Sequence, residues 1–246
     1  MSTKPARGWV HEIFRSIQGE GIYCGQRHTF VRLAGCNLDC SYCDTPASRD
    51  PQPKLCLAQP RPICDDWTTM TNPLDTEIIA AVCAELGAET VAVTGGEPLL
   101  QRDFAVSLLR ELKQSRFRTY LETNGALPDA MRSALPHADV VAMDIKLESA
   151  GGSSVSPQTH LEFLRAASLT EVFVKAVVGA HTATDEIGWW AGLIAEIDHK
   201  IPLVLQPVTG AGRPTSQMLF AMQDTALKSL DDVRVIPQCH KLIGVQ

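Results

Sequence analysis

Short apolar runs alternate with amphipathic stretches along most of the chain. Six runs rich in β-branched and other apolar residues cover residues 28–34, 90–94, 118–123, 139–145, 171–178 and 202–208. Nearly continuous apolar strands of this kind are typical of a parallel sheet that is covered by helices. A seventh run, over residues 233–239, would form an edge strand or a closing strand.

Helical patterns fill the gaps between these runs. In residues 75–87, apolar side chains recur on one face at helical spacing, and Gly87 stands where a helix would end. The same pattern predicts helices over residues 102–114, 157–168, 182–198 and 216–230, and a weaker one over 128–135. Strands that alternate with helices predict a parallel (β/α)6 arrangement, either an open barrel or a doubly wound sheet.

One segment interrupts this alternation. Residues at about 47–73 are rich in proline and poor in periodicity, whereas strand and helix patterns resume on either side. We therefore expect a surface loop inserted into a single domain of residues 1–246, rather than a linker between two domains.

Composition and charge narrow the class of protein. The chain is 45% hydrophobic and 20% charged, which is enough apolar material for a sizeable core. A net charge of −6 without a basic run argues against nucleic acid as a partner. The N-terminal residues contain no apolar signal segment, and no apolar run approaches the ~18 residues of a membrane helix. A cytoplasmic protein with reduced thiols and no membrane partner is expected.

The candidate chemistry begins with GCNLDCSYCDT at residues 35–45, which places Cys36, Cys40 and Cys43 within eight residues. Thiolates this close together can hold a soft metal centre. Four would close a zinc site or an ordinary iron–sulfur site, so three indicate a centre with one open position. Structural zinc remains an alternative, because Cys24, Cys56 or Cys64 could supply a fourth ligand.

Other polar residues follow the predicted strands at their carboxyl ends. In parallel α/β folds the functional site lies at that edge of the sheet. The second and third strands end in Gly-Gly-Glu-Pro (95–98) and Glu-Thr-Asn-Gly (122–125), and the next three carry Asp144 with Lys146, then Lys175, then Gln206. The sequence therefore predicts one site assembled from all six strands.

The CxxxCxxC spacing, together with Thr-Gly-Gly-Glu-Pro at residues 94–98, resembles the radical S-adenosylmethionine (SAM) superfamily. The resemblance implies a partial (β/α)6 barrel and a [4Fe–4S] cluster on Cys36, Cys40 and Cys43, with SAM chelating the fourth iron. Gly95 and Gly96 would let the backbone approach the methionyl amine, and Glu97 would accept from it. Contacts to SAM are implied for Tyr42, Cys43, Asp44, Gly96, Glu97, Glu122, Lys146 and Gln206.

Longer matches narrow the resemblance. The segments EIFRSIQGEG (12–21), FVRLAGCNLDCSYCDT (30–45), LETNG (121–125) and RVIPQCHK (234–241) are similar to the 7-carboxy-7-deazaguanine synthase (QueE) family. That family converts 6-carboxy-5,6,7,8-tetrahydropterin to 7-carboxy-7-deazaguanine with release of ammonia, in queuosine biosynthesis. The resemblance implies Mg²⁺ on Thr45, a homodimer and an electron donor such as flavodoxin or ferredoxin. It implies substrate contacts from Ile17, Gln18, Gly19, Glu20, Arg32, Thr94 and His240.

Two alternatives remain open at this point. A glycyl-radical-enzyme activating enzyme shares the cysteine and Gly-Gly-Glu-Pro motifs, but it would not need Gln-Gly-Glu-Gly (18–21) or Arg32 as a carboxylate clamp. A zinc-stabilised binding module would be colourless, whereas an iron–sulfur protein is brown. The chain also departs from many QueE members by having Asp144-Ile145-Lys146 in place of a Ser-Pro-Lys turn. Cys24, Cys83 and Cys239 are expected only to pack. Free thiols are the first expectation for Cys56 and Cys64, with a redox pair or an extra metal clip as the alternatives.

Overall fold

A ten-stranded sheet organises the computed structural model, which describes residues 6–61, 66–152 and 154–245. Seven consecutive neighbours in this sheet run parallel. In spatial order they are β3 (Arg27–Leu33), β7 (Thr90–Gly95), β8 (Arg118–Thr123), β9 (Val140–Ile145), β10 (Glu171–Val178), β11 (Leu203–Pro207) and β12 (Val233–Val235). These seven strands correspond to the six predicted runs and to the seventh short run.

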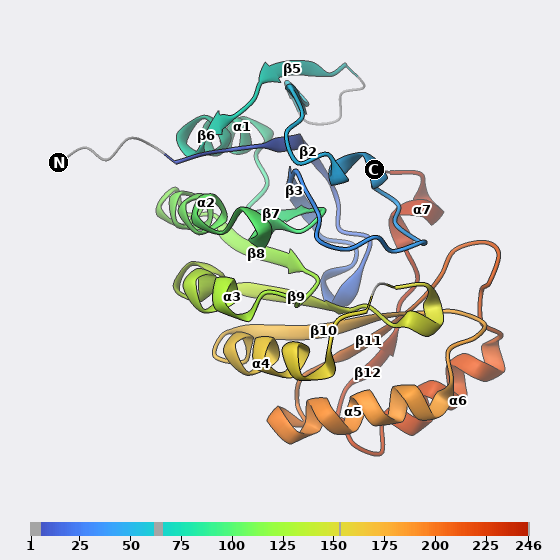
Figure 1. Ribbon diagram of the computed structural model, residues 1–246. Helices are drawn as coiled ribbons and strands as arrows, with labels where there is room; N and C mark the ends of the chain where they lie inside the picture. The colour runs from blue at the N-terminus through green and yellow to red at the C-terminus, as the bar shows by residue number, and fades with distance from the viewer. Residues whose placement is uncertain (1–5, 62–65, 153, 246) are drawn as a thin grey trace.

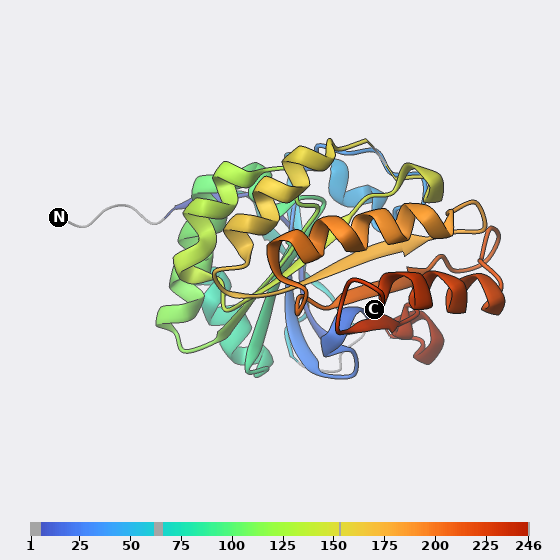
Figure 2. The same ribbon diagram turned by 90° about the horizontal axis from the view of Figure 1, so that it is seen from below.

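Six helices follow one side of the sheet (Figure 1). They are α1 (Thr76–Leu86), α2 (Arg102–Gln114), α3 (Pro128–Ala134), α4 (Pro157–Ala167), α5 (Thr184–Asp198) and α6 (Ser216–Ala226). The last two lie side by side, as the view from below also shows (Figure 2). Because β12 ends the strand order at one edge, the sheet does not close. The predicted partial (β/α)6 arrangement with parallel strands is confirmed.

The side chains of the strands alternate between the two faces of the sheet, and each face carries its own apolar region. Successive side chains of a strand point to opposite faces, so residues two apart share a face. In β10, Val172, Val174 and Ala176 belong to the large core that includes helix residues, whereas Phe173 belongs to a smaller cluster on the other face. We call that other face the inner face. Its buried apolar residues are Phe14, Phe30, Ala92, Tyr120, Val140, Phe173 and Val204.

The inner face changes from apolar to polar toward the carboxyl ends of the strands. In five strands, an apolar residue of the inner face is followed two positions later by a polar residue. The two residues point to the same face, because side chains alternate between the faces along a strand. These polar residues are Arg32, Thr94, Glu122, Lys175 and Gln206. The fold therefore gathers polar side chains at one end of an otherwise apolar inner face.

The N-terminal part of the sheet differs from the prediction. No strand is predicted before residue 28, yet β2 (Val10–Ile17) pairs antiparallel with β3. Its polar residues, among them His11 and Arg15, hide the strand pattern. A short ribbon of β1 (Arg7–Gly8) and β6 (Leu74–Asp75) lies beside the main sheet.

The proline-rich segment is not entirely a loop. It contains β4 (Leu55–Ala58), which pairs parallel with β2, and β5 (Thr68–Thr71), which pairs antiparallel with β4. The loop prediction is wrong for these residues because a four-residue alternation between prolines gives too little pattern to detect. Cys56 is fully buried in the large core, while Cys64 lies outside the described residues. Within the described ranges, no helix is long and apolar enough to cross a membrane.

His28 is a buried histidine without polar partners. It lies on β3, surrounded by the rings of Tyr23, Phe30 and Tyr120. Neither ring nitrogen has a hydrogen-bond partner among the described residues. Burial, aided by the charge of Arg118, lowers the pKa of His28 from 6.5 to about 4. The folded protein therefore holds this imidazole neutral.

We predict that His28 makes the protein sensitive to mild acid. As the pH falls from 6.5 toward 4, His28 becomes protonated in the unfolded chain but stays neutral in the folded protein. The free energy of unfolding therefore decreases. The full effect is about 3 kcal/mol. Urea unfolding of wild type and His28→Leu, at neutral pH and near pH 4, measures it. The variant should lose less stability on acidification, and an equal loss in both proteins would contradict the prediction.

Candidate functional site

A cavity of about 590 Å³ lies at the carboxyl ends of the parallel strands. Its lining comes from the loop after β2, the loop after β3, the ends of β7 to β11 and the C-terminal segment. Every residue predicted to bind metal, cofactor or substrate lines this cavity except Glu97. Residues far apart in the sequence are thus brought together at the predicted edge of the sheet.

The three motif cysteines occupy the irregular segment after β3. The chain turns at Gly35, whose φ of +90° suits glycine, and the Gly35 N–H donates to the Ser48 carbonyl at 2.7 Å. Arg49 closes the segment, because its Nη2 donates to the Cys40 carbonyl at 2.7 Å. Cys36, Cys40 and Cys43 line the cavity, and no other cysteine of the described ranges does. Burial raises the pKa of the Cys36 thiol.

The Gly-Gly-Glu-Pro turn packs directly under the cysteine segment. A Cβ on Gly96 would lie 2.4 Å from the Gly35 carbonyl oxygen and 2.7 Å from the Cys36 Cβ, so only glycine fits there. The Glu97 N–H donates to the same carbonyl at 2.8 Å. These contacts fix the position of the cysteine segment relative to the end of β7.

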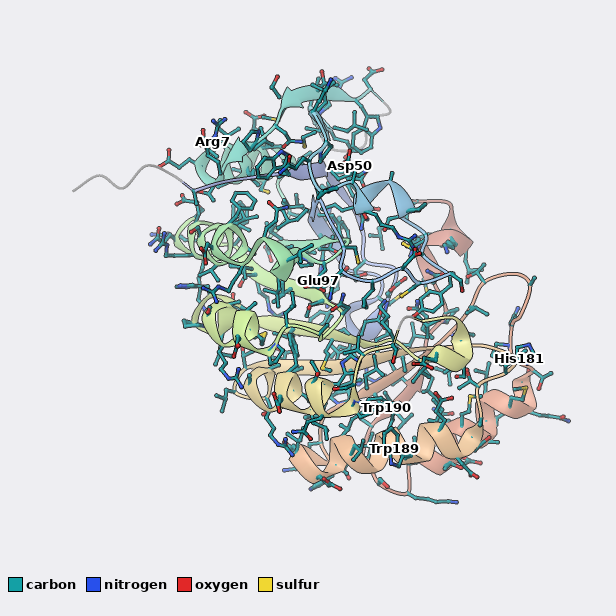
Figure 3. The ribbon with its side chains drawn as sticks, in the orientation of Figure 1. Arg7, Asp50, Glu97, His181, Trp189 and Trp190 are labelled. Atoms are coloured by element: carbon teal, nitrogen blue, oxygen red, sulfur yellow. The ribbon has the colours of Figure 1, made fainter. Side chains whose placement is uncertain are left out.

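Glu97, which is predicted to accept from the methionyl amine of SAM, does not line the cavity. Its buried carboxylate accepts from the N–H groups of Leu99 at 2.9 Å and Asn124 at 2.7 Å, and from Thr123 Oγ1 at 2.9 Å. Burial raises the pKa of this carboxyl group. Figure 3 shows Glu97 in the centre of the fold, near β7 and β8. Glu97 therefore joins the turn after β7 to the end of β8 from behind the cavity.

A chain of buried charges crosses the cavity floor. Asp144 Oδ2 accepts from Lys146 Nζ at 2.7 Å and pairs with Lys175 Nζ at 3.0 Å. Lys175 also pairs with Glu20, which accepts from Gln238 Nε2 at 3.0 Å. We call Lys146, Asp144, Lys175 and Glu20 the ion chain. Sequence reasoning noticed Asp144 and Lys175 at the strand ends, but it assigned no binding role to them.

Electrostatics keep Glu20, Lys175 and Lys146 charged. Burial opposes ionisation of Glu20, yet the Lys175 ammonium lowers the pKa of Glu20 to about 2. Burial likewise opposes the charge on Lys175, but Asp144 and Glu20 raise its pKa well above the usual value. The same balance of burial against Asp144 raises the pKa of Lys146. Because opposite charges alternate, the polar floor needs no external counter-ion.

A second polar group lies on the side of β2. Glu122 accepts from Gln18 Nε2 and from Thr94 Oγ1, both at 2.8 Å. The Gln18 Oε1 atom accepts from the Glu20 N–H at 3.1 Å. Glu122 was predicted to contact SAM, but the structure joins it to residues that were predicted to contact the substrate.

Arg32 is held in place by a carboxylate that the sequence did not reveal. Its Nε donates to Glu12 Oε1 at 2.7 Å, and both side chains are largely buried. The two terminal nitrogens have no hydrogen-bond partner among the described residues, and the side chain lines the cavity. A guanidinium oriented in this way can still present its planar fork to an anion.

The C-terminal segment lines the same cavity. His240 packs on Gly19, where a Cβ would lie 2.2 Å from the His240 Nδ1 atom. One ligand atom from each of Glu20, Asp44 and His240 lies within 4.8 Å of the others. Thr45 follows Asp44 and lines the same cavity. Hard oxygen ligands near Thr45 suit a hard cation such as Mg²⁺.

The cavity contains buried polar atoms without hydrogen-bond partners, which suit a polar cofactor. Three lining residues carry such atoms with no partner among the described residues: Tyr42 Oη, Asp144 Oδ1 and Gln206 Oε1. Lys146 Nζ lies 5.6 Å from the centre of the Tyr42 ring. A buried polar atom without a partner costs free energy, so these atoms favour a ligand that can hydrogen-bond to them. The donor set, three cysteine thiols in the same cavity as three unsatisfied polar atoms, fits a cluster with a polar organic cofactor.

Comparison with known proteins agrees with this geometry. The family model described as the radical SAM superfamily matches residues 30–180. The chain therefore belongs to the radical SAM superfamily, which implies a [4Fe–4S] cluster and SAM as cofactors.

Full-length relatives define the family more closely. The chain is 37% identical to the 7-carboxy-7-deazaguanine synthase of Geobacter sulfurreducens over 246 residues, which cover 96% of each protein. It is 34% identical to the synthase of the same name from Methanothermobacter thermautotrophicus, with 98% of each covered. It belongs to the family of these 7-carboxy-7-deazaguanine synthases, as its motifs predict. The crystal structure of QueE from Escherichia coli shares the fold at a TM-score of 0.63, with 23% identity and 95% of each chain covered.

We predict that the three cavity cysteines, and no others, hold the cluster. Cys36→Ala, Cys40→Ala or Cys43→Ala should each abolish iron retention, whereas Cys56→Ala should retain iron because Cys56 lies in the core. Iron analysis and visible absorbance after anaerobic reconstitution provide the measurement. Loss of the cluster in Cys56→Ala, as complete as in Cys40→Ala, would show that the three-ligand assignment is wrong.

Proposed function

We propose that this protein converts 6-carboxy-5,6,7,8-tetrahydropterin to 7-carboxy-7-deazaguanine with release of ammonia, as a step of queuosine biosynthesis. The observation that carries the proposal is a cavity lined both by three cysteine thiols and by Arg32, which is fixed by Glu12 with its terminal nitrogens available. The relationship with two synthases over their full length supports it. When bound, the cluster and SAM supply a carbon radical that can abstract a hydrogen atom from the substrate.

The cofactors would be held by one half of the cavity. Cys36, Cys40 and Cys43 would bind the cluster, and Gly96 would let the backbone approach SAM closely. The unpaired Tyr42 Oη and Gln206 Oε1 atoms would bond to SAM, with Lys146 beside Tyr42. The remaining assignments to SAM are Asp44, Glu97 and Glu122, and Glu122 would act through Gln18 and Thr94.

The substrate would be held by the other half. Arg32 would bind its carboxylate, because a guanidinium forms two parallel charge-assisted hydrogen bonds to such a group. Glu20 stays ionised at neutral pH, since its pKa is about 2, and can accept from the amino group of the pterin. Backbone and amide groups of Ile17, Gln18 and Gly19, with Thr94 and His240, would complete the hydrogen-bonding edge.

Further partners follow from the same proposal. Mg²⁺ would bind at Thr45, where Asp44, Glu20 and His240 bring additional donor atoms close. Flavodoxin or ferredoxin would supply the electron, and the enzyme would act as a cytoplasmic homodimer. A zinc-stabilised module is less well supported, because within the described part of the chain no fourth cysteine lines the cavity.

We predict that Thr45 couples turnover to Mg²⁺. Replacing Thr45 with alanine removes a hard oxygen ligand, and a methyl group cannot coordinate the ion, so the stimulation of turnover by Mg²⁺ should be blunted. Titrating Mg²⁺ into anaerobic assays of wild type, Thr45→Ala and Thr45→Ser gives the comparison. Serine keeps the hydroxyl and should restore most of the response. If the alanine variant responds to Mg²⁺ as wild type does, Thr45 is not a ligand.

Arg32 provides the sharpest test of the substrate class. Truncating one partner of a buried charge-assisted pair costs on the order of 2–5 kcal/mol, so Arg32→Ala should lower pterin affinity by about two orders of magnitude or more. The cluster and SAM binding should persist. Arg32→Lys should recover only part of the affinity, because an ammonium cannot make the planar two-pronged contact. Isothermal titration under anaerobic conditions measures each affinity.

The matched control is Arg15, a guanidinium on β2 outside the cavity lining that donates to the Leu86 carbonyl at 2.9 Å. Arg15→Ala should leave pterin affinity unchanged. A tetrahydropterin without the carboxylate should bind wild type poorly and lose little more on Arg32→Ala, because both changes remove the same interaction. If the two losses add in full, Arg32 does not bind the carboxylate and the proposed substrate is wrong.

A further inference from the structure

A short helix follows the cysteine segment along the chain and bonds back to it. This helix is η2 (Pro46–Arg49). The Ser48 carbonyl accepts from the Gly35 N–H, at the start of the segment, at 2.7 Å. The Ser48 Oγ atom donates to the Thr45 carbonyl at 2.7 Å, and Ser48 is fully buried. One helical turn therefore joins the beginning of the cysteine segment to its end.

Arg49, the last residue of η2, extends this contact to the middle of the segment. Its Nη2 atom donates to the Cys40 carbonyl at 2.7 Å. The same carbonyl accepts from the Cys43 N–H at 3.3 Å and so closes the turn between two of the cluster ligands. The other terminal nitrogen, Nη1, pairs with Asp39. Arg49 is thus bonded directly to the turn that carries Cys40 and Cys43.

The third nitrogen of the Arg49 guanidinium, Nε, is buried and has no partner among the described residues. Arg49 lines the cavity together with Cys36, Cys40 and Cys43. A buried donor without an acceptor costs free energy, so this atom favours a ligand that supplies an acceptor. The sulfur atoms of an iron–sulfur cluster accept hydrogen bonds. The unpaired Nε–H group therefore fits a cluster bound to the three thiols.

Other parts of the protein also bind the cysteine segment, but at other positions. Their hydrogen bonds join Gly35 to Glu97, Asn37 to Asn124, Ser41 to Gly151 and Asp44 to Gln238. Asp44 also pairs with Lys241 at 3.7 Å. These contacts should keep the segment folded when Arg49 is replaced, whereas the Cys40 carbonyl would lose its 2.7 Å hydrogen bond.

We propose that Arg49 positions the Cys40–Cys43 turn for the [4Fe–4S] cluster and stabilises the reduced cluster with its charge. Reduction moves one electron from an external reductant onto the cluster, which becomes more negative by one charge. A nearby cation lowers the free energy of the more negative state, and a hydrogen bond to a cluster sulfur acts in the same direction. Arg49 should therefore raise the reduction potential. This role concerns the cluster alone, so it is independent of the proposed substrate.

The carboxylate paired with Arg49 does not cancel this effect. The side chain of Asp39 is 87% exposed, whereas that of Arg49 is 31% exposed, so water screens the negative charge more strongly. The two members of the pair should therefore act on the cluster with opposite signs and unequal strength. A pair that only braced the surface would give the same result whichever member was removed.

The experiment measures the midpoint potential of the anaerobically reconstituted protein, without SAM or pterin. Dithionite titration with redox mediators, followed by electron paramagnetic resonance of the reduced cluster, gives the value. Arg49→Gln removes the positive charge and should shift the midpoint to a more negative potential. Asp39→Asn removes the opposite charge and should cause a smaller shift to a more positive potential. Arg49→Lys keeps the charge and should stay closer to wild type than Arg49→Gln does.

The rate of iron loss to a chelator tests the positioning role on the same samples. Arg49→Gln should lose iron about tenfold faster than wild type, because one charge-assisted hydrogen bond to the Cys40–Cys43 turn is removed. The matched control is Arg132→Gln on α3, where the guanidinium pairs with Asp129 outside the cavity lining. Arg132→Gln should keep both the midpoint potential and the rate of iron loss. Circular dichroism of each apoprotein verifies the fold.

The outcomes separate the proposal from its rivals. An unchanged midpoint potential in Arg49→Gln, or iron loss no faster than in wild type, would overturn it. Shifts of the same sign in Arg49→Gln and Asp39→Asn would also overturn it, because they would show that the ion pair acts only as a brace. A folded Arg49→Gln protein that takes up no iron would support the positioning role, and Asp39→Asn would still test the sign of the charge effect. The expected shifts in a protein that does not convert the pterin would contradict the proposed function and leave the role of Arg49 standing.

Discussion

The buried ammonium of Lys175 is the interaction on which the site depends. It lies on β10 between Asp144 of β9 and Glu20 of the loop after β2, so it joins parts of the chain that meet only in the folded sheet. Removing one partner from a buried ion pair typically costs about 3–5 kcal/mol, because the remaining charge is left unpaired. Without Lys175, two carboxylates would face each other across the inner face. The ion chain therefore holds the proposed cofactor half and substrate half at a fixed separation.

The position of this chain follows from the alternation of the strands. Apolar side chains fill the lower inner face, and residues two positions further along point the same way with polar groups. The rings of Phe14, Phe30 and Tyr120 thus form an apolar layer of the inner face beneath Arg32 and Glu122, from which water is excluded. Charged pairs gain strength where water is excluded, which allows a small cavity to orient a polar ligand firmly.

Most of the fold was predictable, and the exceptions have physical causes. Long apolar strands and amphipathic helices can be predicted from their periodicity. In contrast, β2 contains polar residues that obscure its strand pattern, and β4 spans only Leu55–Ala58 between prolines. For the site, nearly every residue that the motifs singled out lines the cavity, because a motif fixes spacing along the chain. They could not reveal partners brought in by folding, such as Glu12 on Arg32 or Gln238 on Glu20. The position of Glu97 behind the cavity depends on its contacts with Thr123 and Asn124, which lie on a different strand end.

The most direct test of this account is an anaerobic assay of the reconstituted brown protein with SAM, a reductant and 6-carboxy-5,6,7,8-tetrahydropterin. The measurement is the ultraviolet spectrum of the product together with the amounts of ammonia and 5′-deoxyadenosine. The account predicts 7-carboxy-7-deazaguanine with an equal amount of ammonia, and many turnovers for each SAM. Continued formation of 5′-deoxyadenosine without any deazaguanine would contradict it, because the radical chemistry would then be intact while the proposed substrate was wrong.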